Sequence, residues 1–238
     1  MAGVTQSTLR GNIVFYDSQY SHRIVDAIGP DVVKWSEEFV KFIDDSTSRN
    51  ALGYTTTEVG TCTIATVAGA DGGNVLITTG GTENNGLQIQ LIGEAFKLNN
   101  SYPCYFGARF QVNDADQVDA LVGLCITDTT AIDGATDGLY FRTVDESAVL
   151  NFVLEKNEAE SSTAAATLTD ATWVEAEWYY DGNSVHAYIN GVEVADVADT
   201  DAGFPNDEWL TPTIALLTGE NTANTMTLAW ARAFQFRN

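Results

Sequence analysis

Two glutamates on one expected strand are the carboxylates best suited to catalysis. Glu175 and Glu177 stand in the alternating segment Trp173–Tyr180, so both carboxylates point to the same face of the strand. Hydrolysis of a glycosidic bond needs two carboxylates placed across one sugar. An i, i+2 pair is too close for this, and no third acid extends it. We interpret both glutamates as part of a solvated strand face, and we predict no catalytic residue and no enzyme activity.

Histidine and aspartate offer few metal ligands. His22 and His186 are the two histidines, and the spacing around them gives no Ser/His/Asp or metal-ligand group. Asp128, Asp133 and Asp137 could ligate calcium through carboxylate oxygens, although their spacing is not that of an EF-hand. A solvated Asp/Gly turn is the favoured interpretation of this segment. We predict no cofactor, and no metal site beyond this calcium alternative.

Charge divides the sequence into two unequal parts. The 238 residues include 33 acidic and 11 basic side chains, for a formal charge of −22. Nucleic acid and anionic membranes are excluded as partners, because both require Lys and Arg at the phosphates. Residues 1–50 hold five basic and seven acidic residues, and residues 51–238 carry the remaining −20. We therefore predict an N-terminal attachment segment (1–50) followed by a β-sandwich domain (51–238).

The cysteines and the N-terminus indicate where the chain folds. Cys62, Cys104 and Cys125 form an odd count without C-x-x-C spacing, which argues against a disulfide framework or a zinc site. The opening residues MAGVTQSTLRGN are polar and lack the apolar region of a secretory signal. These features predict folding in a reducing cytosol.

From Tyr54 onward the sequence is typical of an all-β protein. Segments rich in Thr, Val, Ile and aromatic residues alternate with Gly, Asn and Asp turns, and no long helical period separates them. This pattern favours a sandwich or barrel. The expected strands are Cys62–Val67, Asn74–Thr79, Leu87–Ile92, Tyr105–Val112, Ala120–Thr127, Gly138–Thr143, Val149–Glu155, Trp173–Tyr180, Val185–Ile189, Val192–Val197, Thr213–Leu217 and Met226–Phe236. Those between Trp173 and Val197 form a three-stranded meander, since Asn190-Gly191 is a strong two-residue hairpin turn.

Some segments leave alternatives open. Residues 31–43 fit a helical period slightly better than a strand, whereas residues 12–16 fit a short strand. Glu158–Ala166 is low in complexity and is expected to form an exposed hairpin tip. Arg232 shares a strand face with Trp230, so either it pairs with an acid inside or the strand twists near its end.

The leading segment carries the predicted partner-binding site. It combines aromatic and basic side chains ahead of an acidic body, so it could fold back on its own sheet or bind a partner. An unattached arm would stay loose, because ordering costs about 1–2 kcal/mol per residue. The residues predicted to attach the chain to its partner are Arg10, Phe15, Tyr16, Tyr20, His22 and Arg23.

Several stretches resemble concanavalin A-like, laminin-G-like jelly rolls. Trp173–Gly191 resembles their "W…Y-D-G…V…Y-x-N-G" stretch, and Tyr105–Val112 resembles their "F-x-A-R-F-x-V" strand. Asp137–Arg142 resembles the core strand that follows. Over roughly residues 85–238, the fuller series is similar to sandwich proteins encoded among the structural genes of tailed bacteriophages. It adds Gly93–Leu98, Val122–Thr129, Leu150–Lys156 and Leu210–Thr213.

The resemblance implies an all-β, two-sheet antiparallel jelly-roll sandwich with an N-terminal extension. It also implies a non-enzymatic virion component, a capsid decoration (cement) protein on the outer face of the head. The expected partners are the major capsid protein and further copies of this chain, in a homo-oligomer such as a trimer. Its expected location is the capsid exterior, after synthesis in the host cytoplasm.

Two further functions follow from the same class of fold. A carbohydrate-binding module would use an open sandwich face, or the loops that hold Trp209 and Asp128–Asp137. Trp209 is the tryptophan expected near the surface, whereas Trp173, Trp178 and Trp230 are expected in the core. A glycoside hydrolase of this class would carry E-x-D-x-x-E on one strand, a string absent from this sequence.

Overall fold

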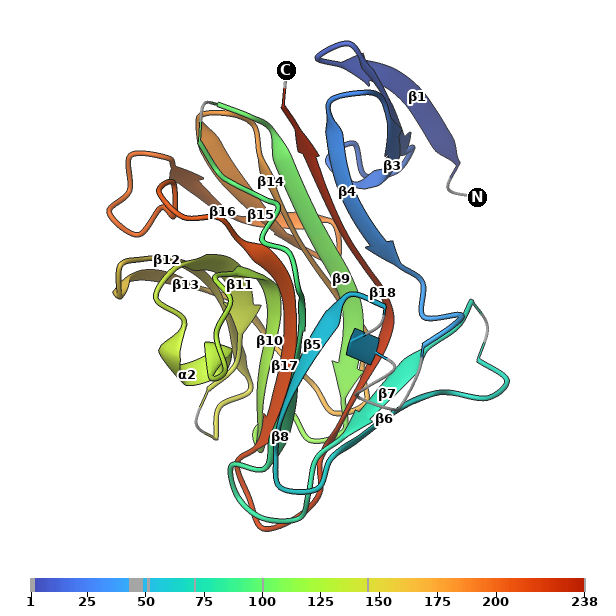
Figure 1. Cartoon of the computed structure of the whole chain (residues 1–238), viewed down its shortest axis with the longest axis vertical. Coiled ribbons are helices and arrows are strands. Elements are labelled where there is room, and N and C mark those ends of the chain that lie inside the picture. The colour runs from blue at the N-terminus through green and yellow to red at the C-terminus, as the bar shows by residue number, and fades with distance from the viewer. Residues whose placement is uncertain are drawn as a thin grey trace.

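The computed structural model describes residues 3–42, 49–50, 52–70, 72–99, 101–144 and 146–237. In these ranges nearly all of the regular secondary structure is β-strand, and all strand pairs are antiparallel. Two large sheets stack face to face, which confirms the predicted two-sheet sandwich (Figure 1). No helix in the described residues is both long and apolar enough to cross a membrane.

The first large sheet has seven strands in the order β13-β12-β11-β10-β17-β8-β5. Its central strand β10 pairs with β11 on one side and with β17 on the other. The strands are β5 (Tyr54–Val59), β8 (Gly86–Leu91), β10 (Val118–Cys125), β11 (Gly138–Arg142), β12 (Val149–Lys156), β13 (Ala159–Thr167) and β17 (Thr211–Thr218).

The second large sheet follows the order β16-β15-β14-β9-β18-β7-β6. Its longest strand is β18 (Thr225–Phe236), which pairs with β9 along one edge. Along the other edge it pairs with β7 near its start and with β4 (Val32–Glu37) near its end. The remaining strands are β6 (Thr63–Thr66), β7 (Val75–Thr78), β9 (Cys104–Val112), β14 (Val174–Tyr180), β15 (Ser184–Ile189) and β16 (Val192–Ala198).

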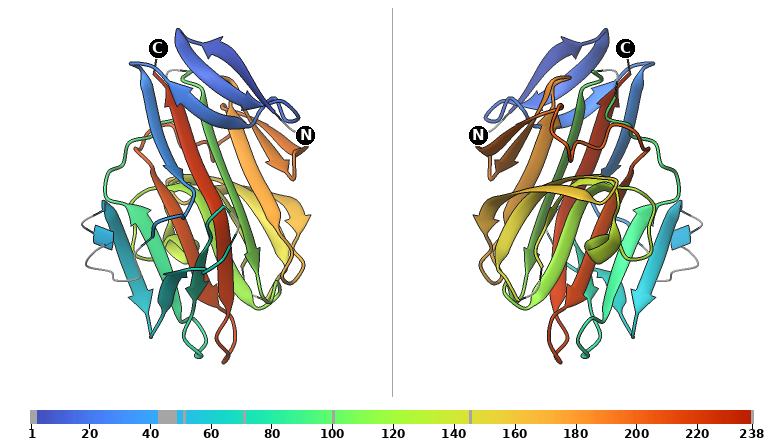
Figure 2. Two further views of the ribbon diagram at one scale, coloured as in Figure 1. Left: turned by 90° about the vertical axis from the view of Figure 1, so that its right-hand side faces the viewer. Right: turned by 90° about the vertical axis from the view of Figure 1, so that its left-hand side faces the viewer.

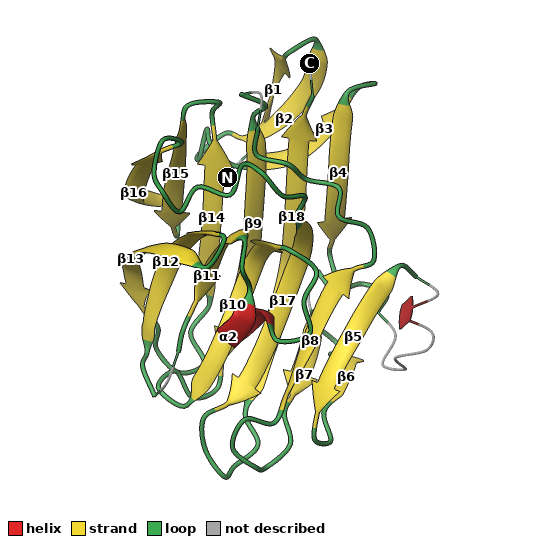
Figure 3. Ribbon diagram, turned by 60° about the vertical axis from the view of Figure 1, so that its left-hand side comes forward, coloured by secondary structure: helices red, strands yellow, loops and turns green. Residues whose placement is uncertain are grey.

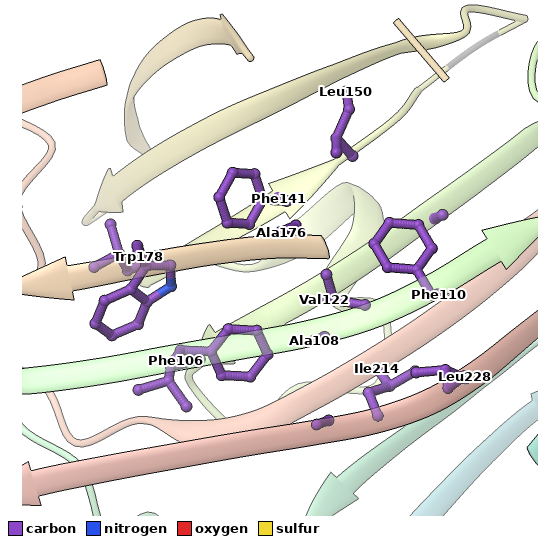
Figure 4. Packing of buried hydrophobic residues seen from close by; sticks show 14 of the residues in the cluster. Phe106, Ala108, Phe110, Val122, Phe141, Leu150, Ala176, Trp178, Ile214 and Leu228 are labelled. Atoms are coloured by element: carbon purple, nitrogen blue, oxygen red, sulfur yellow. The ribbon is translucent and has the colours of Figure 1, made fainter. Parts of the chain in front are cut away.

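The core lies between these two sheets. Each strand buries alternate side chains, as the period of two requires, so β9 contributes Phe106, Ala108 and Phe110 while β14 contributes Ala176 and Trp178. Residues of the seven-stranded sheet meet them from the opposite side (Figure 4): Val122, Phe141, Leu150 and Ile214. Several of these are aromatic and fully buried, and each such side chain stabilises the fold by about 1.5–3 kcal/mol.

Each outer face of the sandwich carries a further layer (Figures 2 and 3). A three-stranded sheet of β1 (Val4–Leu9), β2 (Asn12–Asp17) and β3 (Ile24–Ile28) covers part of the second sheet. It buries Val14, Ile24 and Ala27 against Tyr105 and Phe234. On the other side, the short helix α2 (Ala131–Gly134) packs on the seven-stranded sheet. The outward side chains of both sheets are therefore partly buried.

The expected strands of the body are confirmed as β6 to β12 and β14 to β18, with ends shifted by one or two residues. The alternative left open for residues 31–43 is decided in favour of a strand: Val32–Glu37 is β4, because pairing with β18 satisfies its backbone, while residues 43–48 lie outside the described ranges. One segment differs from expectation. The exposed tip expected at Glu158–Ala166 is wrong: the turn is confined to Asn157–Glu158, and β13 pairs along the whole of β12.

Candidate functional site

Three neighbouring strands of the second sheet form the floor of the candidate site. Their register places Glu175 of β14 beside Arg109 of β9, and Arg109 beside Trp230 of β18. The next outward row runs from Glu177 through Gly107 to Arg232. A Cβ on Gly107 would lie 2.4 Å from the Tyr105 hydroxyl and 3.1 Å from the Trp230 ring. Gly107 therefore leaves the space that the surrounding side chains occupy.

Arg23 enters this floor from the loop between β2 and β3. Its Nε donates to Glu177 Oε1 at 2.8 Å, and its Nη2 donates to Glu177 Oε2 at 2.6 Å. Nη2 also donates to Glu175 Oε2 at 2.6 Å. Glu177 is fully buried, and the Tyr105 hydroxyl donates to its Oε1 at 2.6 Å. This bidentate pair joins the N-terminal sheet to the second sheet of the sandwich.

Arg23 and Glu177 both stay ionised in the buried pair. Burial alone would raise the pKa of Glu177, but hydrogen bonds from the His22 and Arg23 side chains, the charge of Arg23 and the Tyr105 hydroxyl lower it to about 2. Burial likewise opposes the charge of Arg23, but its hydrogen bonds with Glu177 and the two nearby carboxylates raise its pKa. Both groups are therefore ionised at neutral pH, and Glu177 does not have the raised pKa of a general acid.

Aromatic rings pack around the ion pair. The Arg23 guanidinium lies 4.7 Å from the centroid of the Tyr20 ring, and the His22 ring stacks on Tyr188 with centroids 3.5 Å apart. The His22 Nε2 lies 3.5 Å from Glu177 Oε2. Tyr20 packs over the β15–β16 turn, where a Cβ on Gly191 would lie 2.1 Å from its ring. The leading segment is thus fitted to a preformed surface of the body.

A hollow of about 320 Å³ opens beside the ion pair. Trp230 and Arg232 of β18 line it together with Arg23, Asp17 and residues of β1 and β3: Gly3, Val4 and Val25. The guanidinium of Arg232 lies 4.8 Å from the centroid of the Trp230 ring, and Arg232 pairs with Glu38 at 2.6 Å. The hollow therefore offers one half-buried aromatic ring surrounded by charged hydrogen-bonding groups.

The comparisons with known proteins agree with this architecture. The family model described as "SO2946-like, C-terminal domain" matches residues 70–229. The chain belongs to this family. The N-terminal sheet and β4 precede the matched range of the SO2946-like domain. No curated protein sequence matches the chain.

Solved structures similar to this chain share its fold at low sequence identity. The protein of unknown function SO2946 from Shewanella oneidensis MR-1 has a TM-score of 0.61 and 12% identity over 87% of each chain. A mixed linkage glucan GH16 protein of Bacteroides ovatus, in complex with its product, has a TM-score of 0.59 and 10% identity, covering 83% of this chain and 98% of the other. The carbohydrate recognition domain of Emp46p, in its potassium-bound form, has a TM-score of 0.57 and 8% identity, covering 83% and 94%.

These similarities confirm the concanavalin A-like jelly roll predicted from the sequence. None of these three structures is described as a virion component, so the capsid-decoration function and its partners stay predictions. Glycosyl hydrolases occur among the similar structures, but at such low identity they show the fold alone.

The six residues predicted to attach a partner now have defined positions in the N-terminal sheet and its loops, ahead of the range matched by the family model. Tyr20, His22 and Arg23 come together at the buried ion pair. Tyr16 packs beneath the N-terminal sheet, and Arg10 donates to the carbonyl of Ser101 at 2.7 Å. Phe15 is half-buried on β2. Five of the six residues therefore contact the body of their own chain. Their contact with a partner stays a prediction.

Three interpretations of outward-facing residues were wrong. Glu177 was expected on a solvated face, but the N-terminal sheet covers it and Arg23 neutralises it. Trp173 and Trp230 were expected in the core, but both are half-buried: the Trp173 ring contacts the Arg109 guanidinium, and Trp230 lines the hollow on the outer face of β18. The sequence did carry a signal for Trp230, since Arg232 shares its face. Arg232 pairs with Glu38, but Glu38 is an exposed acid on the outer face and not the acid inside that was one of the two alternatives.

The described residues bring no calcium site together at Asp128, Asp133 and Asp137. Asp128 accepts hydrogen bonds from Thr130, and the buried Asp137 accepts one from the Asn157 backbone. A different group lies on the β15–β16 hairpin, where His186 Nδ1 is 3.3 Å from Glu193 Oε1 and 3.8 Å from Asp196 Oδ1. Tetrahedral ligands held at about 2.1 Å from an ion lie about 3.4 Å apart, so the Glu193 separation fits and the Asp196 separation is wider.

Proposed function

We propose that the chain is a non-enzymatic carbohydrate-binding domain whose site is the hollow at Trp230. The observation that carries this proposal is a half-buried indole ring at the wall of an open hollow lined by charged groups. Sugars present one apolar face and many hydroxyls, so they suit an aromatic surface flanked by a few placed polar groups. Arg23, Arg232 and Asp17 supply such groups. Of the structures with the same fold, the Emp46p structure is described as a carbohydrate recognition domain, and the GH16 protein is in complex with its product.

The carboxylates support binding rather than hydrolysis. Glu177 is held ionised by Arg23, and Glu175 lies next to Arg23 and to Arg109. A glycoside hydrolase needs one carboxyl group that is protonated at working pH. Glu177 does not meet that requirement, and both glutamates accept hydrogen bonds from Arg23 that hold the N-terminal sheet. We therefore expect no release of reducing sugar from any glycan that binds.

The experiment compares two tryptophan variants. Glycan-array screening identifies a ligand, and calorimetry then measures its affinity for the wild type, Trp230→Ala and Trp209→Ala. Trp209 is the matched control, because it is also partly exposed and flanked by cations, Lys97 and Arg237, but lies in a distant loop. We expect Trp230→Ala to weaken binding about tenfold, equivalent to about 1.4 kcal/mol of lost stacking, and Trp209→Ala to leave it unchanged. Absence of glycan binding, or loss through Trp209 alone, would contradict the proposal.

A further inference from the structure

The first strand has a free edge. β1 pairs with β2 on one side, and among the described strands no other strand pairs with it. Residues 4–8 are all exposed, on both faces of the strand. An exposed edge offers a row of unpaired N–H and C=O groups to any strand that can approach it.

The geometry of the hairpin shows which backbone groups are free. Arg10 and Gly11, with φ of 48° and 77°, form the two-residue turn between β1 and β2. At the other end of the hairpin, Ser18 N donates to Gly3 O at 2.9 Å. Hydrogen-bonded pairs alternate along an antiparallel ladder, so residues 3, 5, 7 and 9 bond to β2. The N–H and C=O groups of Val4, Gln6 and Thr8 therefore point away from β2 toward the free edge.

This edge lacks the features that usually block strand addition. β1 contains no proline and no charged residue, and its register with β2 has no bulge. It also carries few charges that would repel a second copy. Residues 3–16 contain no Asp or Glu in a chain with a net charge of −22, and their one basic residue, Arg10, already contacts Ser101. Two copies of so acidic a chain meet least repulsion where carboxylates are absent.

We propose that β1 pairs antiparallel with β1 of a second copy to form a two-fold symmetric dimer. Centred on Gln6, this pairing sets Gln6 opposite Gln6 of the second copy and Val4 opposite its Thr8. The free N–H and C=O groups of all three residues then bond across the two-fold axis. No like charges face each other, and the exposed Val4, with 59% of its surface accessible, gains a neighbour. The two three-stranded sheets become one continuous six-stranded sheet.

The test uses substitutions at the symmetry centre in the full chain. Sedimentation velocity over a wide concentration range should show a monomer–dimer equilibrium for the wild type. Gln6→Pro removes the free N–H at the edge without touching the bonds from β1 to β2, so we expect a monomer. Gln6→Ala keeps that N–H and is the matched control, with dimerisation expected within about threefold of the wild type.

Gln6→Lys guards against the chance that proline disturbs the hairpin. It keeps every backbone donor but sets two positive charges face to face in the dimer, so dimerisation should weaken at low salt and recover at high salt. A wild type that is monomeric at all concentrations would overturn the proposal. So would an oligomer, including a trimer, that forms equally well with Gln6→Pro and Gln6→Lys in place.

Discussion

Arg23 and Glu177 lie 154 residues apart in the sequence and form the buried ion pair that fastens the N-terminal sheet. Removing one partner of such a pair leaves a charge buried without compensation. We therefore expect Arg23→Ala to lower the free energy of unfolding by about 3–5 kcal/mol, measured by urea denaturation. Lys34→Ala is the control, because the Lys34–Asp26 pair is half-exposed and should contribute about 0–1 kcal/mol. If the two substitutions lowered the free energy of unfolding equally, the Arg23–Glu177 pair would not stabilise the fold as a buried ion pair.

The same pair predicts a dependence on pH. The pKa of Glu177 is about 2 in the folded chain, against an ordinary value of 4.5. A lowered pKa stabilises the fold above the ordinary value, and this stabilisation is lost as the pH falls toward the folded-state value. The stability difference between the wild type and Glu177→Gln should therefore be largest above pH 4.5 and shrink between pH 4.5 and 2. Taking this difference cancels the titration of the other carboxylates, and a difference independent of pH would refute the assignment.

The role of these residues could be predicted only in part from the sequence. Arg23, His22 and Tyr20 stood out as a basic and aromatic group ahead of an acidic body. Their partner Glu177 could not be identified, because alternation gives the face of a strand but not what covers that face. Trp230 was assigned to the core because strict alternation places it on the face of Leu228, whereas a β-bulge between Leu228 and Trp230 turns Trp230 to the outer face. A short sheet from the N-terminus covers part of the outer face and leaves Trp230 at its border.

Among the elements, the strands best predicted from the sequence are those whose pairing depends on residues close together in the chain. The β14–β16 meander follows from alternation and from the Asn190-Gly191 turn, whose φ values are 50° and 79°. β4 and β13 depend instead on partners distant in sequence. The segment of β4 fits a helix by itself, and pairing with β18 decides otherwise. β13 is rich in Ala and Ser, which favour no strand, and its backbone is held by β12.

Two hairpin glycines allow a matched comparison between elements. Gly11 and Gly191 have nearly the same φ, 77° and 79°, so alanine at either position incurs a similar backbone strain of about 1–2 kcal/mol. Only at Gly191 would the new Cβ meet another group, the Tyr20 ring at 2.1 Å, whereas nothing lies within 4 Å at Gly11. We expect Gly191→Ala to lower thermal stability more than Gly11→Ala. Equal losses would show that Tyr20 does not depend on this turn.

The whole molecule is a layered sandwich whose outer faces are partly covered by its own chain. The N-terminal sheet lies on one face and α2 on the other, and each adds a small apolar cluster to the central core. The sheets follow from the alternation of the body, but the covering layers do not, because their contacts join parts of the chain distant in sequence. Among the described residues, the hollow at Trp230 and the edge of β1 are left uncovered by these layers.

The net charge of −22 destabilises the folded state, since like charges repel more strongly when they are close together. Asp114 and Asp116 show the effect locally: burial first, and then the neighbouring Asp116, raise the pKa of Asp114. Asp116→Asn removes one of these two charges and should raise the melting temperature at low salt. Glu208→Gln makes the same change of net charge at another exposed acid.

Asp116→Asn should stabilise the fold more than Glu208→Gln at low ionic strength, and the gap should close as salt shortens the Debye length to about 3 Å near 1 M. Calorimetric melting curves of the two variants at low and high NaCl measure this gap directly. A gap that persists at high salt would mean that the aspartate pair acts through local packing or hydrogen bonding rather than through charge repulsion.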